Sequence, residues 1–136
     1  MVEIQIEYRG ELRTGSVHGP SGTELVTDAP TDNQGRGESY SPTDLVATAL
    51  GTCMATIMAM AARERGIELA GTRVRVEKHM AAEPVRRIAR LEVTIEVPHD
   101  LDEEARATLE EAARGCPVTA SMGAEVEIPV TFRWGS

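Results

Sequence analysis

Hydrophobic and polar positions alternate near both ends of the chain. Residues 2–8, 73–80, 91–97 and 126–134 each show a period of two, with hydrophobic side chains separated by charged or polar ones. This period is typical of β-strands that turn one face to a core and the other to water. The pattern therefore predicts strands at both ends of the chain, each in a sheet with one face in water.

Two of these segments carry irregularities. The hydrophobic positions change parity between Ile88 and Leu91, which predicts a β-bulge at that point. Pro129 lies in the last segment and lacks the amide hydrogen that a central strand needs. The last strand is therefore expected at an edge of its sheet.

A long helix is predicted over residues 42–65, after a loop over residues 27–40. Ser41 can cap its N-terminus, Pro42 suits the first helical position, and Asp44 can bond back to the Ser41 amide. Gly66 is expected to end the helix in a left-handed conformation. A second helix is predicted over residues 101–114, with Gly115 as its stop. Strands at both ends and helices between them indicate an α+β protein, and the length predicts one domain over residues 1–136.

No charged side chain occurs from residue 45 to residue 62. A membrane span would need a run of this length, but its alanines and threonines insert weakly. A helix that is apolar all round is more often buried, and a chain this small cannot cover it on every side. We therefore expect no membrane contact but a homodimer, whose central helices meet through the small residues Ala47, Gly51 and Ala55.

The composition excludes some classes of partner. The net charge is −8, the pI is about 4.9, and aromatic residues make up 3% of the chain. Nucleic-acid binding needs a basic surface and stacking rings, so we expect no nucleic-acid partner. Residues 1–10 lack the basic and apolar regions of a secretion signal. A cytoplasmic, reducing location is expected, with both cysteines free at rest.

The two cysteines, Cys53 and Cys116, leave several interpretations open. Cys53 lies in the uncharged helix, where a free cysteine often serves only as a small hydrophobic side chain. Metal binding is disfavoured because the three histidines show no ligand spacing, so we expect no metal and no cofactor. Cys116 lies at a helix boundary, where backbone amides of the next turn could favour its thiolate. Two ordered thiols weakly favour redox chemistry.

The stretches "SPTDLVATALGTCMATIMAMAARERGIEL" and "ARGCPVTASM" resemble the OsmC/Ohr family of peroxide-handling proteins. The resemblance runs from about Tyr8 to Trp134, and its most specific part is the pair formed by a cysteine in the central helix and a later one in "CPV". It implies antiparallel sheets packed around a long central helix in an intertwined homodimer. It also implies a thiol-dependent peroxidase.

The family resemblance assigns roles to the two cysteines. Cys53 matches the cysteine that attacks an organic hydroperoxide and becomes a sulfenic acid. Cys116 matches the one that condenses with it into a disulfide, which an external dithiol of the lipoyl type then reduces. A thiol in an apolar pocket needs a nearby cation to form a thiolate. The family supplies an arginine from the first strands, for which Arg13 is the best match, before Arg9 and Arg36.

One position departs from the family pattern. Family members with peroxidase character carry a glutamate ten residues before the reactive cysteine, where it holds the arginine; here that position is Thr43. Threonine cannot form this ion pair. Asp44 and Glu38 are the candidates to replace it, although Asp44 already has a structural role as a capping residue.

The departure keeps a second class of function open. A dimeric apolar cleft with Cys53 at its base could bind a hydrophobic or electrophilic small molecule without turnover. An interaction scaffold is a third, less specific interpretation. The arginine and acid that support Cys53 are the feature that separates a peroxidase from a binding protein.

Overall fold

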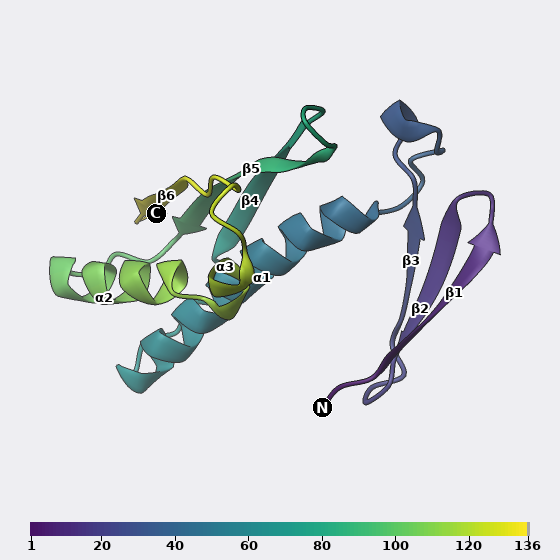
Figure 1. Cartoon of the computed structure of the whole chain (residues 1–136). Coiled ribbons are helices and arrows are strands. Elements are labelled where there is room, and N and C mark those ends of the chain that lie inside the picture. Colours follow the sequence, from purple (N-terminus) through teal and green to yellow (C-terminus); the bar gives the residue numbers. More distant parts are fainter. Residues whose placement is uncertain (136) are drawn as a thin grey trace. The chain divides into compact units, whose positions relative to one another are not determined.

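The computed structural model describes residues 1–135 and divides the chain into two compact units, Met1–Val46 and Ala47–Ser136. The first unit is a sheet with a loop after it, and the second is a sheet with helices (Figure 1). The α+β class expected from the alternating and helical patterns is confirmed.

The first unit holds three antiparallel strands in chain order: β1 (Ile4–Gly10), β2 (Arg13–His18) and β3 (Glu24–Asp28). A short 3-10 helix, η1 (Thr31–Asn33), follows in the predicted loop. Glu11 and Leu12 at the β1–β2 turn both have positive φ. Arg13 pairs in register with Asp28 across β2 and β3, so the ends of these two strands lie side by side.

The sheet of the first unit leaves hydrophobic side chains in water. Ile4, Ile6 and Tyr8 on β1 are 57%, 70% and 64% exposed. The alternation in this segment predicts a core-facing side, yet within the first unit that side is not covered. A surface of this kind in a soluble protein marks a place where another surface packs.

Helix α1 (Pro42–Glu64) agrees with the predicted helix within one residue at its C-terminus. The capping box is present: Asp44 N–H donates to Ser41 Oγ at 3.1 Å, and Ser41 N–H donates to Asp44 Oδ2 at 2.9 Å. Gly66 has φ of 71°, which is the predicted left-handed stop. The start and the end of this helix are thus explained by local sequence alone.

The second unit contains a sheet in the order β4 (Arg73–Ala81), β5 (Arg87–Val97) and β6 (Val130–Trp134). β4 and β5 are antiparallel, and Met80 pairs with Ile88 while His79 pairs with Arg90, which leaves Ala89 as the extra residue of the predicted bulge. β6 is an edge strand, as Pro129 predicts, but it starts later than expected and runs parallel to β5.

Two shorter helices complete the second unit: α2 (Glu103–Arg114), capped by Asp102, and α3 (Pro117–Ser121), which the sequence pattern did not predict. The buried side chains of α1, β5 and α2 form one hydrophobic core with Leu69 and Cys116. In this core Leu50, Met58, Leu91, Ile95 and Leu109 have no exposed surface. The helices therefore lie on the sheet through one shared apolar layer (Figure 1).

The faces of α1 differ from the expectation. A Cβ added at Gly51 would lie 2.9 Å from Val76 Cγ2 and 3.2 Å from Val74 Cγ1, so this glycine packs on β4 of its own chain. Ala47 is also buried, at 7% exposed. The predicted contact between the central helices of two subunits through Ala47 and Gly51 is therefore wrong. These small residues instead let the sheet of the same chain approach α1 closely. The exposed side of α1 instead carries Ala49, Thr52, Thr56 and Met60.

Helix α1 is long and apolar enough to cross a membrane, with a mean hydropathy of 1.8 over its most apolar window. The core helix of a soluble protein meets the same criterion. Leu50, Met54, Met58 and Ala62 of α1 are buried against the sheet and α2, which is the behaviour of a core helix.

Candidate functional site

The candidate site is built on the two cysteines, which belong to the same unit. Cys53 lies in the middle of α1, next to the fully buried Met54, and its side chain is partly exposed while packing against the hydrophobic core. The helix holds this thiol at the boundary between the core and the open side of α1.

Cys116 lies in the break between α2 and α3. Gly115 caps the end of α2, and Pro117 begins α3, so the chain turns at this residue. Cys116 is 0% exposed and serves as the N-cap of α3. Its Sγ accepts a hydrogen bond from Thr119 N–H at 3.4 Å and lies 3.2 Å from Thr119 Oγ1. A sulfur atom here takes the place of the usual capping oxygen.

The two side chains interact directly and differ in acidity. Burial raises the pKa of the Cys53 thiol, a backbone hydrogen bond from Val118 lowers it, and a hydrogen bond with Cys116 raises it further. Burial also raises the pKa of Cys116, but hydrogen bonds from Thr119, Cys53 and Val118 outweigh it and leave this pKa below its ordinary value. Cys116 is thus the more acidic thiol of the pair. A disulfide between the two residues would need their α-carbons roughly 4.4 to 6.8 Å apart, or brought there by a local shift.

Arg13, the arginine expected from the family pattern, lies in the first unit and forms ion pairs there. Its guanidinium contacts Glu38, and its Nη2 lies 3.4 Å from Asp28 Oδ2. Glu38 was one of two residues expected to replace the missing glutamate, and it does contact Arg13. Arg13 Nε is buried and makes no hydrogen bond.

Asp28 is the residue that sequence analysis missed. Its side chain is fully buried, and its Oδ2 accepts a hydrogen bond from Glu38 N–H at 3.0 Å. This hydrogen bond, against the opposing effect of burial and together with the Arg13 charge, lowers the pKa of Asp28 below its ordinary value. A buried carboxylate is rare unless it is paired. The signal in the sequence was the acid that ends "TELVTD", but only the β2–β3 register places it beside Arg13.

The remaining candidates have other partners. Asp44 forms the capping box of α1 with Ser41, as described above, and Thr43 Oγ1 lies 3.2 Å from Ser41 Oγ. Arg9 pairs with Glu7 at 3.5 Å on the polar side of β1. Arg36 pairs with Glu11 at 3.6 Å. Arg13 is held by two carboxylates, so these contacts favour it over Arg9 and Arg36 as the arginine of the family pattern.

A group of side chains with metal-binding character lies on β4 and β5. His79 Nε2 is 3.8 Å from Glu77 Oε2 and 3.9 Å from Glu92 Oε2, a grouping that the spacing of histidines along the sequence did not reveal. Arg75 already contacts Glu77, and Arg90 lies 3.6 Å from Glu92. Guanidinium groups neutralise both carboxylates, so the group is best described as an exposed ion-pair network.

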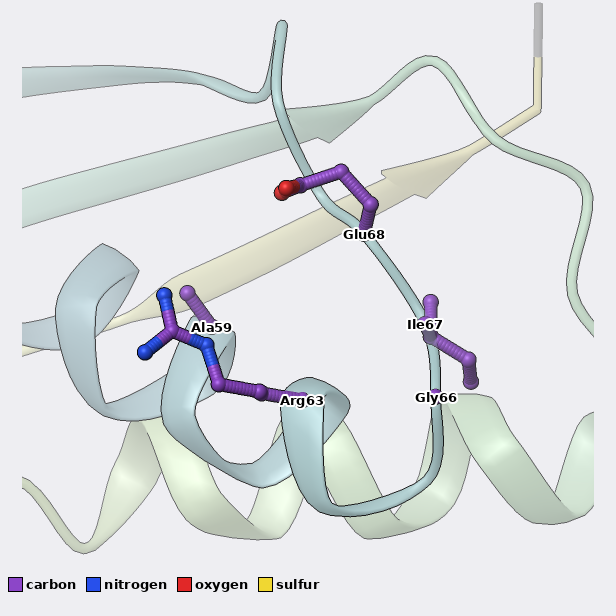
Figure 2. Close-up of a pocket in the computed structure, with 5 residues that line it drawn as sticks. All are labelled: Ala59, Arg63, Gly66, Ile67 and Glu68. Atoms are coloured by element: carbon purple, nitrogen blue, oxygen red, sulfur yellow. The ribbon is translucent and has the colours of Figure 1, made fainter.

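A hollow of about 220 Å³ lies where α1 ends, lined by Ala59, Arg63, Gly66, Ile67 and Glu68 (Figure 2). Neither cysteine lines it. The volume is below that of usual small-molecule sites, which is roughly 300–1,000 Å³. The chemistry of the thiol pair is therefore separate from this hollow.

The profile of the OsmC-like protein family matches residues 35–131. The chain belongs to the OsmC-like protein family. No curated protein matches its sequence significantly.

Solved structures of similar fold agree with the assignment of this chain to the OsmC-like protein family. A crystal structure from Psychrobacter arcticus 273-4, provisionally described as an osmotic stress induced and detoxification response protein, is 41% identical with a TM-score of 0.92, covering 97% of this chain and 96% of that one. An organic hydroperoxide resistance protein OsmC from Legionella pneumophila is 16% identical with a TM-score of 0.79, covering 98% and 96%. A provisionally described organic hydroperoxide resistance protein from Vibrio cholerae, with captopril in one of its active sites, is 17% identical with a TM-score of 0.77, covering 97% and 90%. The last two show a shared fold.

Proposed function

We propose that this OsmC-like protein is a thiol-dependent peroxidase that reduces organic hydroperoxides. The observation that carries the proposal is the hydrogen-bonded pair of Cys53 and Cys116 in one unit. Neighbours of the same fold are described as organic hydroperoxide resistance proteins, which supports the substrate class. The proposed activity takes place in the cytoplasm, uses an external dithiol as reductant, and needs no metal or cofactor.

In the proposed cycle Cys53 attacks the terminal oxygen of the hydroperoxide. The O–O bond breaks, the alkoxide leaves and takes up a proton as the alcohol, and Cys53 becomes a sulfenic acid. The Cys116 thiolate then attacks the sulfur of Cys53, and hydroxide leaves and becomes water on protonation. A disulfide remains, and two electrons from a dithiol restore both thiols. The partly exposed Cys53 suits the first step, and the buried Cys116 suits the second.

Arg13 is proposed to favour the thiolate of Cys53, in the role that the family pattern gives this arginine. The high pKa that burial confers on Cys53 shows why a cation is needed. Glu38 and Asp28 are proposed to replace the glutamate that is absent at Thr43, because both contact Arg13.

The test is the consumption of tert-butyl hydroperoxide with a dithiol reductant. Wild-type protein should turn over, whereas Cys53→Ser should reduce no more than buffer with reductant does. Cys116→Ser is the matched variant: it should form the Cys53 sulfenic acid once and then stop or overoxidise to the sulfinic form. Wild-type protein that keeps two free thiols after hydroperoxide treatment would remove the proposal.

A binding protein is the second candidate function, and one observation favours it. Burial raises the pKa of the Cys53 thiol above its ordinary value, which disfavours the thiolate that a peroxidase needs. Binding of a hydrophobic or electrophilic compound without turnover would leave the hydroperoxide assay at background while Cys53 is still protected from alkylation by the bound compound.

A further inference from the structure

The two sulfurs of the candidate site differ in how a third sulfur can reach them. Thiol–disulfide exchange requires the attacking thiolate to approach one sulfur from the side opposite to the other. Cys116 is 0% exposed and lies in the core between α2 and α3, whereas Cys53 keeps exposed surface. Within the chain, Cys53 thus offers exposed surface to an incoming thiol, whereas Cys116 offers none.

The two sulfurs also differ as leaving groups. Thr119 N–H donates to Sγ of Cys116 at 3.4 Å, and the Thr119 hydroxyl lies 3.2 Å from the same atom. Both groups can donate to a thiolate, and such hydrogen bonds are stronger when the acceptor is charged. The pKa of Cys116 lies below its ordinary value and that of Cys53 above it, in agreement with these contacts. A sulfur of lower pKa leaves faster.

We propose that a reducing dithiol attacks Sγ of Cys53 in the Cys53–Cys116 disulfide, and that Cys116 leaves as a thiolate held by Thr119. The proposal rests on the proposed function, since it describes the reductive half of the same cycle. It makes Thr119 a positioning residue for the leaving sulfur.

The reaction balances in two exchanges. One thiolate of the dithiol bonds to Cys53 as the Cys53–Cys116 bond breaks, and the electron pair of that bond stays on Cys116. The second thiol of the reductant, after losing its proton, attacks its own sulfur in the mixed disulfide and releases Cys53, which takes up a proton as a thiol. The dithiol is oxidised to a cyclic disulfide, and both protein sulfurs are reduced.

The first experiment maps the intermediate in wild-type protein. Diamide converts the two thiols to the Cys53–Cys116 disulfide without a hydroperoxide, and mass spectrometry verifies the bond. A monothiol, 2-mercaptoethanol, is then added, the reaction is quenched with N-ethylmaleimide, and each cysteine is mapped by tandem mass spectrometry. The mercaptoethanol adduct should lie on Cys53 and the maleimide on Cys116. Adducts that lie mainly on Cys116 overturn the proposal.

The second experiment tests Thr119. In Thr119→Val the hydroxyl is lost while size and β-branching stay, so reduction of the disulfide by dithiothreitol should slow by roughly two- to ten-fold, the effect of one hydrogen bond. Thr119→Ser should restore the rate. Thr131→Val, an exposed threonine on β6, is the matched control and should react like wild type.

A spectroscopic measurement separates positioning from a merely structural effect. In a Cys53→Ser background the ultraviolet absorbance of the Cys116 thiolate gives its pKa, which should rise when Thr119 is changed to valine but not when it is changed to serine. An unchanged pKa together with an unchanged reduction rate overturns the role of Thr119.

The outcomes also separate this proposal from the peroxidase cycle. If diamide forms the disulfide but hydroperoxide does not, the proposed function fails, and the adduct map still decides the route of reduction. If hydroperoxide forms the disulfide and the adduct lies on Cys116, the function stands and the route is wrong. If neither diamide nor hydroperoxide forms the disulfide, both are overturned.

Discussion

Single residues decide whether Cys53 is reactive, because its burial works against the thiolate that the chemistry needs. Arg13 is the proposed cation, and removing it should raise the pKa of Cys53. In Arg13→Ala the rise of the Cys53 alkylation rate with pH should therefore be shifted to higher pH. The oxidation of Cys53 by hydroperoxide should also slow. The measurement is the iodoacetamide rate against pH, in a Cys116→Ser background so that one thiol reports.

The matched control is Arg9→Ala, since Arg9 pairs with Glu7 on the polar side of β1. Its pH profile should coincide with that of the unmodified background. If the pH profile shifts in Arg9→Ala but not in Arg13→Ala, Arg9 and not Arg13 is the cation that favours the Cys53 thiolate.

Asp28 ties stability to pH. The Glu38 amide and the Arg13 charge hold its pKa below 3.8, so the carboxylate stabilises the folded state above the pKa of the unfolded chain, and this contribution is lost as pH falls through the lowered folded pKa. Asp28→Asn should thus lower the melting temperature near neutral pH, and its difference from wild type should shrink in acid below pH 3.8. The exposed Glu24→Gln on the same strand should change little at any pH. A difference for Asp28→Asn that is constant with pH would show that its charge is not involved.

Among the elements, α1 shows a conflict between helix propensity and packing. Replacing a mid-helix glycine with alanine normally stabilises by roughly 1 kcal/mol. At Gly51 the new Cβ would lie 2.9 Å from Val76 Cγ2, and overpacking of this kind costs about 1–3 kcal/mol. Gly51→Ala should therefore be less stable than wild type by about 1 kcal/mol in urea unfolding at fixed protein concentration.

Ala107→Gly, at an exposed position inside α2, is the control for this substitution. It removes a methyl group where nothing is packed within the chain, so it should cost roughly 1 kcal/mol through propensity alone. If Gly51→Ala proves more stable than wild type, the close contact between α1 and β4 is not rigid.

The elements that could be predicted from sequence are those set by local chemistry. The capping box at Ser41 and the stop at Gly66 depend on residues within one turn, and the bulge at Ala89 follows from a change of parity. The parallel pairing of β6 with β5 could not be predicted, because alternation reports a buried face and not the direction of the neighbouring strand. Helix α3 is too short for a periodic pattern to be visible.

The candidate site was likewise predictable from the sequence only in part. Both cysteines were marked by their position in the pattern, and their contact follows from the fold. The Asp28 partner of Arg13 was not predicted, since it depends on the register between two strands. Gly51 was assigned to a partner helix for a related reason: a small residue shows that something approaches closely, but it does not show which element does so.

At the scale of the whole molecule, each unit has an apolar surface that the unit itself does not cover. The sheet of the first unit exposes Ile4, Ile6 and Tyr8, and the open side of α1 carries Thr52, Thr56 and Met60, which is 57% exposed. The hydroxyls of Thr52 and Thr56 are bonded to carbonyls of the preceding turn at 2.8 Å, so this helix side presents methyl groups. Surfaces of this type are normally buried in an assembly.

We therefore expect a homodimer in which the open side of α1 is covered by the partner subunit. Sedimentation at micromolar concentration should give a mass close to twice 14.7 kDa. Thr56→Arg places a charge on that side while keeping helix propensity, so it should shift the protein towards monomer. Thr131→Arg puts the same charge on exposed β6 and should stay dimeric. A wild-type protein that sediments only as a monomer would contradict the expectation. A dimer that tolerates Thr56→Arg would place the interface elsewhere, with the exposed face of β1 as the next surface to test by Ile6→Lys.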